Sequence, residues 1–212
     1  VRRRGMSPTF SSLYVRNYRI YAGGSLVSNI GTWMQTTAQA WLVLELTSSG
    51  ALLGLVLGLQ LLPSLLFSPI AGVVADKVSK RLLLAWMQIG MAVPAVALGI
   101  LALTDRVQVW HVLTLAFLFG IARAFEAPAR QSFVSEIVEK DRLTNAVSLN
   151  SASFNTGRLI GPALAGLMIA ALGSGVDATG WVILANALSY GFVVLSLWAL
   201  DPADLSPSPR GS

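Results

Sequence analysis

Four uncharged stretches, each long enough to cross a membrane, limit most strongly what this chain can fold into. Residues 20–44, 46–75, 82–104 and 178–200 contain no Asp, Glu, Lys or Arg. A bilayer core about 30 Å thick is crossed by roughly 20 helical residues, so each stretch can span it. Charged residues make up only 12% of the chain, about half the share in a soluble domain. The sequence therefore predicts a membrane protein.

Two further apolar stretches contain few charges. Arg123 and Glu126 lie near the end of one stretch, and Arg158 lies within the other. The sequence thus predicts an all-α membrane protein with six transmembrane helices, and it contains no cysteine that could form a disulfide. The expected spans lie at about residues 20–44, 50–75, 82–104, 108–127, 145–172 and 178–200.

The positions of Lys and Arg predict how the helices are oriented, because cytoplasmic loops hold an excess of these residues. The N-terminal segment and the connections at 76–81 and 128–142 hold most of them and the C-terminal tail holds Arg210, whereas the three opposite connections hold only Arg106. Both termini are therefore expected in the cytoplasm. We expect a basic cytoplasmic segment at residues 1–19, a disordered cytoplasmic tail at 201–212, and a segment along the inner membrane face at 128–142.

Small residues recur every four positions on two of the expected helices. In lipid, helices associate through close packing of such residues. These small faces either pack among the six helices or receive helices from outside the chain, and the sequence leaves both alternatives open. The residues are Gly50, Gly54 and Gly58 on the second expected helix, and Gly157, Gly161 and Ala165 on the fifth.

Two motifs carry a resemblance to a known family. The connection between the second and third expected helices follows the pattern Gly-x-x-x-Asp-Lys/Arg-x-Gly-Lys/Arg-Lys/Arg, with Ser79 where glycine is usual. Together with a glycine and proline motif on the fifth helix, it resembles the major facilitator superfamily and its antiporters. The matching residues are Gly72, Asp76, Lys77, Lys80 and Arg81 in the connection, and Gly157, Gly161, Pro162 and Gly166 on the fifth helix.

The resemblance extends from about residue 16 to residue 200 and carries expectations about architecture. Stretches such as NAVSLNSASFNTGRLIGPALAG are similar to the branch that contains the enterobactin exporter and transmembrane secretion effectors. The chain then corresponds to the N-terminal six-helix half, a 3+3 inverted repeat, of a two-half transporter. It is a fragment, a truncated gene product or a half that works as a dimer, and we favour truncation.

The resemblance also implies a function. The chain is expected to be part of a secondary active transporter in the bacterial inner membrane that exports a small molecule, such as a drug or a siderophore, by alternating access. Expected partners are the lipid bilayer, a small-molecule substrate, and the missing C-terminal half or a second copy. Coupling to protons would require a carboxylate at mid-depth, for which Glu126 is the nearest candidate. No cofactor, metal or nucleic acid is implied.

In the family, the connection from Gly72 to Arg81 acts as a cytoplasmic latch, and Asp76 faces the opposite half. The alternative is a half-size membrane scaffold or regulatory protein that transports nothing.

Several polar residues within the expected spans are candidates for a substrate cavity. An arginine near the bilayer centre is costly and must face protein or water, so we expect Arg158 to point inward. Arg123 and Glu126 are three residues apart and can pair on one helix face. Each uncharged candidate has the alternative role of an interhelical hydrogen bond. These uncharged candidates are Asn29, Gln35, Gln60, Gln88, Asn150 and Asn155.

An intramembrane enzyme is the rival class, and the sequence argues against it. The chain has one histidine, His111, at the outer edge of a span, and no Gly-x-Ser-Gly motif lies within a span. No glycine-rich phosphate loop is found either. We therefore expect no enzymatic activity.

Overall fold

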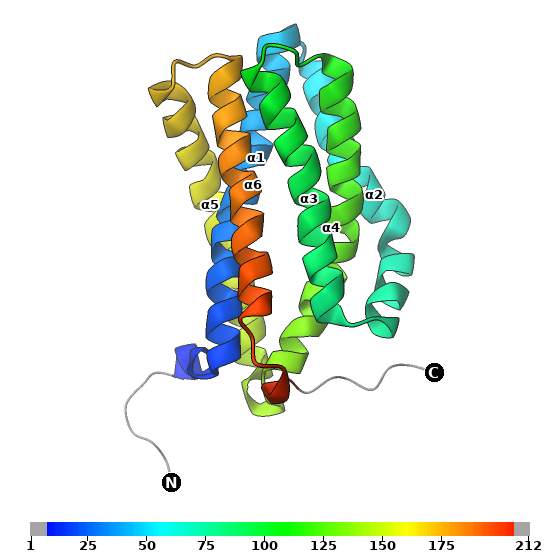
Figure 1. Cartoon of the computed structure of the whole chain (residues 1–212), viewed down its shortest axis with the longest axis vertical. Helices are drawn as coiled ribbons and strands as arrows, with labels where there is room; N and C mark the ends of the chain where they lie inside the picture. Colours follow the sequence, from blue (N-terminus) through cyan, green and yellow to red (C-terminus); the bar gives the residue numbers. More distant parts are fainter. Residues whose placement is uncertain (1–7, 206–212) are drawn as a thin grey trace.

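The computed structural model describes residues 8–205, and this part of the chain forms a bundle of long helices (Figure 1). Short 3-10 helices precede and follow the bundle. The bounds are η1 Pro8–Tyr14, α1 Arg16–Thr47, α2 Gly50–Lys77, α3 Lys80–Leu103, α4 Val109–Ile137, α5 Lys140–Ala171, α6 Val176–Trp198 and η2 Pro202–Asp204. Each expected span therefore falls on one helix. Residues 1–7 of the expected basic segment and 206–212 of the expected tail lie outside the described residues.

The segment 128–142 does not form a separate element along the membrane face. Instead α4 continues through Pro128 to Ile137, and α5 begins at Lys140. The physical reason is that the end of α4 is amphipathic. Phe133 is fully buried there, and its ring meets that of Tyr21 edge-to-face, with 5.3 Å between the centroids. Because this apolar face packs on α1, the helix continues as part of the bundle.

Four of the described helices, α2, α3, α4 and α6, are long and apolar enough to cross a membrane by length and composition. The helices α1 and α5 are more polar. On α1, many polar side chains are turned into the protein, including the buried residues Ser25, Ser28, Asn29, Gln35 and Gln39. These polar side chains of α1 therefore line the interior of the bundle.

The helices pack in a repeated pattern. The helix α1 packs most extensively on α5 and α6, α4 packs on α2 and α3, and α3 packs on α6. Exchanging α1 with α4, α2 with α5 and α3 with α6 leaves this pattern unchanged. The helices α2 and α5 lie farthest from the centre, with few buried residues on either.

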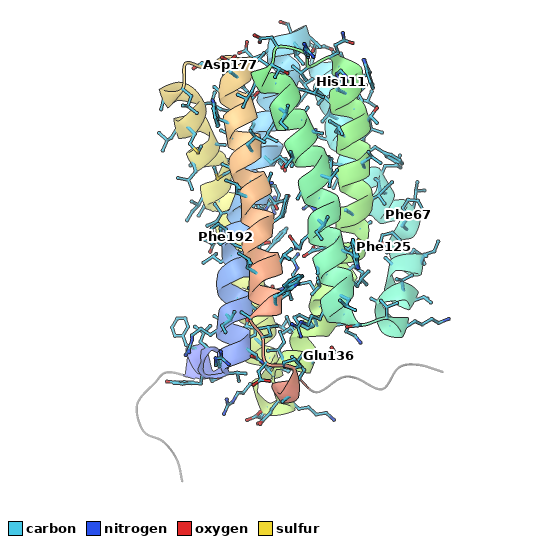
Figure 2. The ribbon with its side chains drawn as sticks, viewed as in Figure 1. Phe67, His111, Phe125, Glu136, Asp177 and Phe192 are labelled. Carbon is cyan, nitrogen blue, oxygen red and sulfur yellow. The ribbon has the colours of Figure 1, made fainter. Side chains whose placement is uncertain are left out.

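The core divides into two apolar clusters, one towards each end of the bundle. Phe119 and Ile183 belong to the first, on the side of His111 and Asp177, and Phe133 and Leu197 belong to the second, on the side of Glu136 (Figure 2). On α1, α3 and α4 the two clusters are separated by polar residues, and these residues form a polar layer inside the bundle.

The two small-residue faces have different surroundings. On α5, a methyl group added at Gly157 would lie 2.7 Å from the backbone carbon of Asn29, so this face packs tightly on α1. On α2, a methyl group at Gly50, Gly54 or Gly58 would meet no atom within 4 Å in the described chain. The small residues of α5 therefore pack against another of the six helices, whereas the glycines of α2 have no neighbour in the described chain.

Candidate functional site

The polar layer surrounds a small interior cavity of about 30 Å³. Helices α1, α3, α4, α5 and α6 all contribute to its wall. Such a volume is sufficient for about one or two water molecules, and its polar lining suits them. The lining residues are Ser25, Ser28, Asn29, Thr32, Trp33, Gln88, Met91, Arg123, Glu126, Arg130, Phe154 and Val193.

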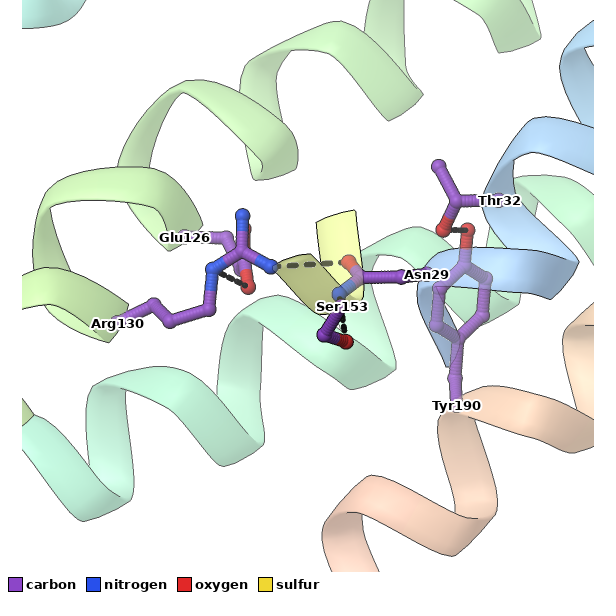
Figure 3. Close-up of polar contacts among 6 residues, drawn as sticks. All are labelled: Asn29, Thr32, Glu126, Arg130, Ser153 and Tyr190. Carbon is purple, nitrogen blue, oxygen red and sulfur yellow. Dashed lines mark hydrogen bonds and ion pairs between the residues drawn. The ribbon is translucent and has the colours of Figure 1, made fainter. Parts of the chain in front are cut away.

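A chain of polar contacts through this layer joins three helices (Figure 3). Arg130 Nε lies 3.3 Å from Glu126 Oε1, one helical turn earlier on α4. Arg130 Nη1 also donates to Asn29 Oδ1 on α1 at 3.0 Å, and Asn29 Nδ2 donates to Ser153 Oγ on α5 at 3.0 Å. An ion pair with side chains this deeply buried is stable only if hydrogen bonds satisfy its remaining groups, and Asn29 supplies one of them.

The prediction that Arg123 forms an ion pair with Glu126 is therefore wrong. Glu126 pairs with Arg130, four residues later, because Asn29 of α1 holds the Arg130 guanidinium on that side. Arg123 is half-buried and lines the cavity, and it forms no hydrogen bond or ion pair with any residue between 8 and 205. It is thus a cation that faces a polar space without a direct partner in this part of the chain.

A larger hollow of about 390 Å³ lies between α4 and α5, on the other side of the same charged residues. Arg123, Glu126 and Arg130 line both this hollow and the small cavity. Asn155, an expected cavity residue, lies here, and Asn150 and Ser151 add further polar groups. The charged layer of α4 is therefore reached from the α4–α5 side of the bundle.

Gln35 and Gln60 form hydrogen bonds between helices, the alternative to lining a substrate cavity. Gln35 Oε1 accepts from Asn186 Nδ2 on α6 at 2.6 Å, and Asn186 Nδ2 also donates to the hydroxyl of Tyr190 at 2.9 Å. Gln60 Nε2 of α2 donates to Gln39 Oε1 of α1 at 3.0 Å. Both glutamines are buried, and their hydrogen bonds join α1 to its neighbours.

Arg158 does not turn into the bundle as expected. It is exposed on α5, and its guanidinium carbon lies 5.8 Å from the centre of the Trp33 ring, a cation–π distance. The indole Nε1 of Trp33 is buried without a hydrogen-bond partner among the described residues, as is Oε1 of Gln88. Both orphaned atoms belong to residues that line the small cavity.

The charged connection between α2 and α3 is attached to the rest of the bundle at two points. Lys80 is 6% exposed, and its Nζ lies 2.9 Å from Glu136 Oε1 on α4. Arg81 Nη2 donates to the carbonyl oxygen of Trp198 at 3.4 Å. Asp76 and Lys77 are exposed, and Asp76 forms no hydrogen bond or ion pair within residues 8–205. Gly72 faces open space.

The helix-five motif is divided between two environments. Gly157 and Gly161 contact α1, and a methyl group on Gly161 would lie 2.6 Å from Trp33 Cβ. Pro162 is half-buried, and Gly166 faces open space. The first half of the motif therefore packs α5 against α1.

Sequence reasoning missed several residues of the polar layer and its neighbours. Asn186 and Tyr190 are four residues apart on α6, and this spacing places both on one helix face. The spacing was the sequence signal that could have identified them as neighbours in the polar layer. Arg130 was assigned only to the cytoplasmic connection, because the sequence does not reveal that α4 extends beyond residue 127. Gln39 and Ser153 carry no sequence signal that separates them from other polar residues in these spans.

Six helices in a repeated three-helix pattern, apolar outside and charged within, are the architecture of a multi-pass membrane protein of the major facilitator superfamily. The same architecture occurs in a solved bacterial homologue of the human lysosomal transporter Spinster, in an inward-facing and unoccupied conformation. That match has a TM-score of 0.66 and 17% identity, and covers 98% of this chain and 45% of the other. Residues 7–208 match the model of the transmembrane secretion effector family, and the chain belongs to this family. It is thus a multi-pass protein of the bacterial cell membrane and not an enzyme.

Curated relatives include efflux proteins and a siderophore transporter. The chain is 32% identical over 178 residues to the staphyloferrin A transporter of Staphylococcus aureus and 31% identical over 184 residues to the multidrug efflux pump Tap of Mycolicibacterium fortuitum. Each alignment covers 84% of this chain and 44% of the relative. The macrolide efflux protein A of Streptococcus pyogenes is 25% identical over 159 residues, which are 75% of this chain and 39% of that protein. The chain thus spans less than half the length of these relatives.

Proposed function

We propose that this chain forms the N-terminal half of an exporter that moves small organic molecules across the membrane by alternating access. The observation that carries the proposal is the charged layer of Arg123, Glu126 and Arg130, buried between two apolar clusters and reached from the α4–α5 hollow. Charges at such depth are costly and mark substrate or ion pathways. The relatives named for a siderophore, for macrolides and for several drugs support a small organic substrate.

All six helices cross the membrane in this proposal, with both termini in the cytoplasm and the two three-helix units related as an inverted repeat. The symmetric packing of α1–α3 and α4–α6 supports the repeat. The helix α1 crosses despite its polarity, because its polar residues face the protein interior, where they are hydrogen-bonded. The distribution of Lys and Arg supports the orientation.

A second six-helix unit completes the transporter, either as a C-terminal half or as a second copy. Three observations support this unit. The small-residue face of α2 has no neighbour in the described chain, Arg158 on α5 is exposed where it needs protein or water, and the relatives are about twice as long. The second unit covers α2 and α5, and closes the α4–α5 hollow into a substrate chamber.

The connection from Gly72 to Arg81 acts as the latch between the two units. Lys80 and Arg81 fix it to α4 and α6 of this half, which leaves Asp76 exposed for the opposite unit. If protons drive export, Glu126 is the carboxylate that carries them, because it is 7% exposed and lines both the interior cavity and the hollow.

Efflux from cells tests the proposal. Accumulation of ethidium and of a radiolabelled macrolide is measured in cells that produce the chain alone, and in cells that produce it in frame with the C-terminal half of the multidrug pump Tap. Reduced accumulation is expected for the joined form and not for the chain alone. Replacing Arg123 by Gln should abolish the reduction, and Arg106→Gln, an exposed arginine at the opposite end of the bundle, should leave it intact.

Efflux by the chain alone, without a second half, would require the dimeric form of the proposal. If the joined form reaches the membrane and no substrate is exported, the non-transporting scaffold becomes the better description. If Arg106→Gln and Arg123→Gln reduce efflux equally, the assignment of the charged layer to the substrate pathway is wrong.

A further inference from the structure

A second hollow lies on the outside of the bundle, between the beginning of α3 and the end of α6. It has a volume of about 500 Å³ and is lined by Ser79, Arg81, Leu82, Ala85 and Trp198. It shares no lining residue with the interior cavity or with the α4–α5 hollow. The proposed transport pathway therefore leaves this hollow unexplained.

Arg81 supplies the charge of this hollow. Its one hydrogen bond in the described chain runs from Nη2 to the carbonyl oxygen of Trp198 and is long, at 3.4 Å. The other N–H groups of the guanidinium are free for a further partner. A guanidinium presents its donors in a planar fork that matches the oxygens of a phosphate.

The charges around the hollow leave Arg81 uncompensated. Lys80 is neutralised by Glu136 at 2.9 Å. Asp76 and Lys77, both exposed at the end of α2, are of opposite sign and offset each other. Among the described residues, Arg81 is the only charged residue that lines the hollow, and it forms no ion pair, which favours an anion over a neutral or zwitterionic group.

An apolar surface begins directly beside this cation. Leu82 and Trp86 lie one helical turn apart on α3 and are 61% and 64% exposed. Leu195 and Trp198 lie nearly one turn apart on α6 and are 65% and 73% exposed. In a membrane protein such a face contacts acyl chains, and tryptophan is enriched at the level of the lipid headgroups. A cation at this level, with an apolar face above it, is complementary to the charged headgroup and the acyl chains of a phospholipid.

We propose that the α3–α6 hollow binds the headgroup of an anionic phospholipid. The phosphate accepts hydrogen bonds from the Arg81 guanidinium, and the acyl chains follow the apolar surface formed by Leu82, Trp86, Leu195 and Trp198. A soluble anion fits the structure less well, because it leaves this apolar surface unused. The inference rests on the membrane location of the family and not on any transported substrate.

Quenching of tryptophan fluorescence by brominated lipids tests the proposal on the full 212-residue chain. The chain is reconstituted into phosphatidylcholine vesicles that contain either dibromo-phosphatidylglycerol or dibromo-phosphatidylcholine. The contribution of Trp198 is the difference between the parent chain and Trp198→Phe. For this contribution, phosphatidylglycerol should be preferred about fivefold, the factor that one arginine near an anionic surface supplies.

The variant Arg81→Gln should remove this preference, and the matched control Lys77→Gln, which loses the same charge outside the hollow, should retain it. Added inorganic phosphate should not change the quenching, because it cannot use the apolar surface. Equal quenching by both lipids in the parent chain overturns the proposal, and so does an equal loss of preference in both variants. Displacement by free phosphate would show a soluble-anion site and would overturn the lipid assignment. If Arg81→Gln does not fold, the comparison of the two lipids with the parent chain still decides.

Discussion

Lys80 and Glu136 form a buried ion pair that joins the beginning of α3 to the end of α4, with 2.9 Å between Nζ and Oε1. The pair converts part of an exposed charged connection into an internal contact of the bundle. It also distinguishes Lys80 from Lys77, which lies three residues earlier and is exposed.

Replacing Lys80 by Met should destabilise the bundle, because it removes the cation that lies 2.9 Å from the buried Glu136 carboxylate. Breaking a buried pair in this way costs about 3–5 kcal/mol. The unfolding temperature in detergent measures the effect, and Lys77→Met is the matched control that should change little. The double variant Lys80→Met/Glu136→Met should recover part of the loss. No recovery would mean that the two residues act independently.

Replacing Gly157 by Ala should separate α5 from α1, because the added methyl group would lie 2.7 Å from a backbone atom of Asn29. Overpacking of this kind costs about 1–3 kcal/mol. The free energy of unfolding in mixed micelles is the measurement. Gly166→Ala on the same helix faces open space and should be neutral or stabilising, since alanine favours helix by about 1 kcal/mol over glycine. Equal effects of the two substitutions would contradict the close contact.

Replacing Glu126 by Gln should reduce export about tenfold or more in the two-half form. The substitution removes the carboxylate that pairs with Arg130, and hydrogen bonds to charged groups contribute about 1.5–3 kcal/mol. Ethidium efflux, normalised to protein in the membrane, is the readout. Glu45→Gln, at the exposed end of α1, is the control. Unchanged efflux in Glu126→Gln would exclude this carboxylate from substrate or proton transport.

Replacing Asp76 by Asn in the two-half form should abolish most export while the protein still reaches the membrane. Asp76 is exposed and forms no hydrogen bond or ion pair within residues 8–205, so its loss should not lower the stability of the six-helix bundle. Efflux and unfolding temperature are measured together, with Asp177→Asn at the opposite end of the bundle (Figure 2) as the control. A loss of stability that parallels the loss of efflux would argue against a latch.

The α3–α6 hollow and the interior charged layer make separate predictions. Arg81→Gln should change lipid preference and leave the wall of the interior cavity intact, because Arg81 lines only the outer hollow. Glu126→Gln should alter the wall of the interior cavity and leave the lipid preference unchanged, because Glu126 does not line the outer hollow. Failure of the efflux experiments therefore leaves the lipid site standing, and failure of the quenching experiment leaves the transport proposal standing.

The helices could be predicted from the sequence, because in lipid each backbone polar group must be paired within its own helix or barrel. That requirement turns every long apolar run into a helix, so the expected spans 20–44 and 178–200 fall on α1 and α6. The two motifs gave the superfamily, and the family match over residues 7–208 agrees with it. The sequence also argued against an enzyme, and the family match agrees with that expectation.

Only the tertiary structure decided which side chains meet. Glu126 has Arg123 and Arg130 at almost equal sequence distance, and the position of Asn29 on α1 makes Arg130 its partner. Glycine stripes on α2 and α5 look alike in the sequence, yet α1 covers only the stripe on α5. Helix formation in a membrane depends on the local backbone, which the sequence determines directly. Pairing depends on the surfaces that neighbouring helices present, and these surfaces are defined only when the bundle is assembled.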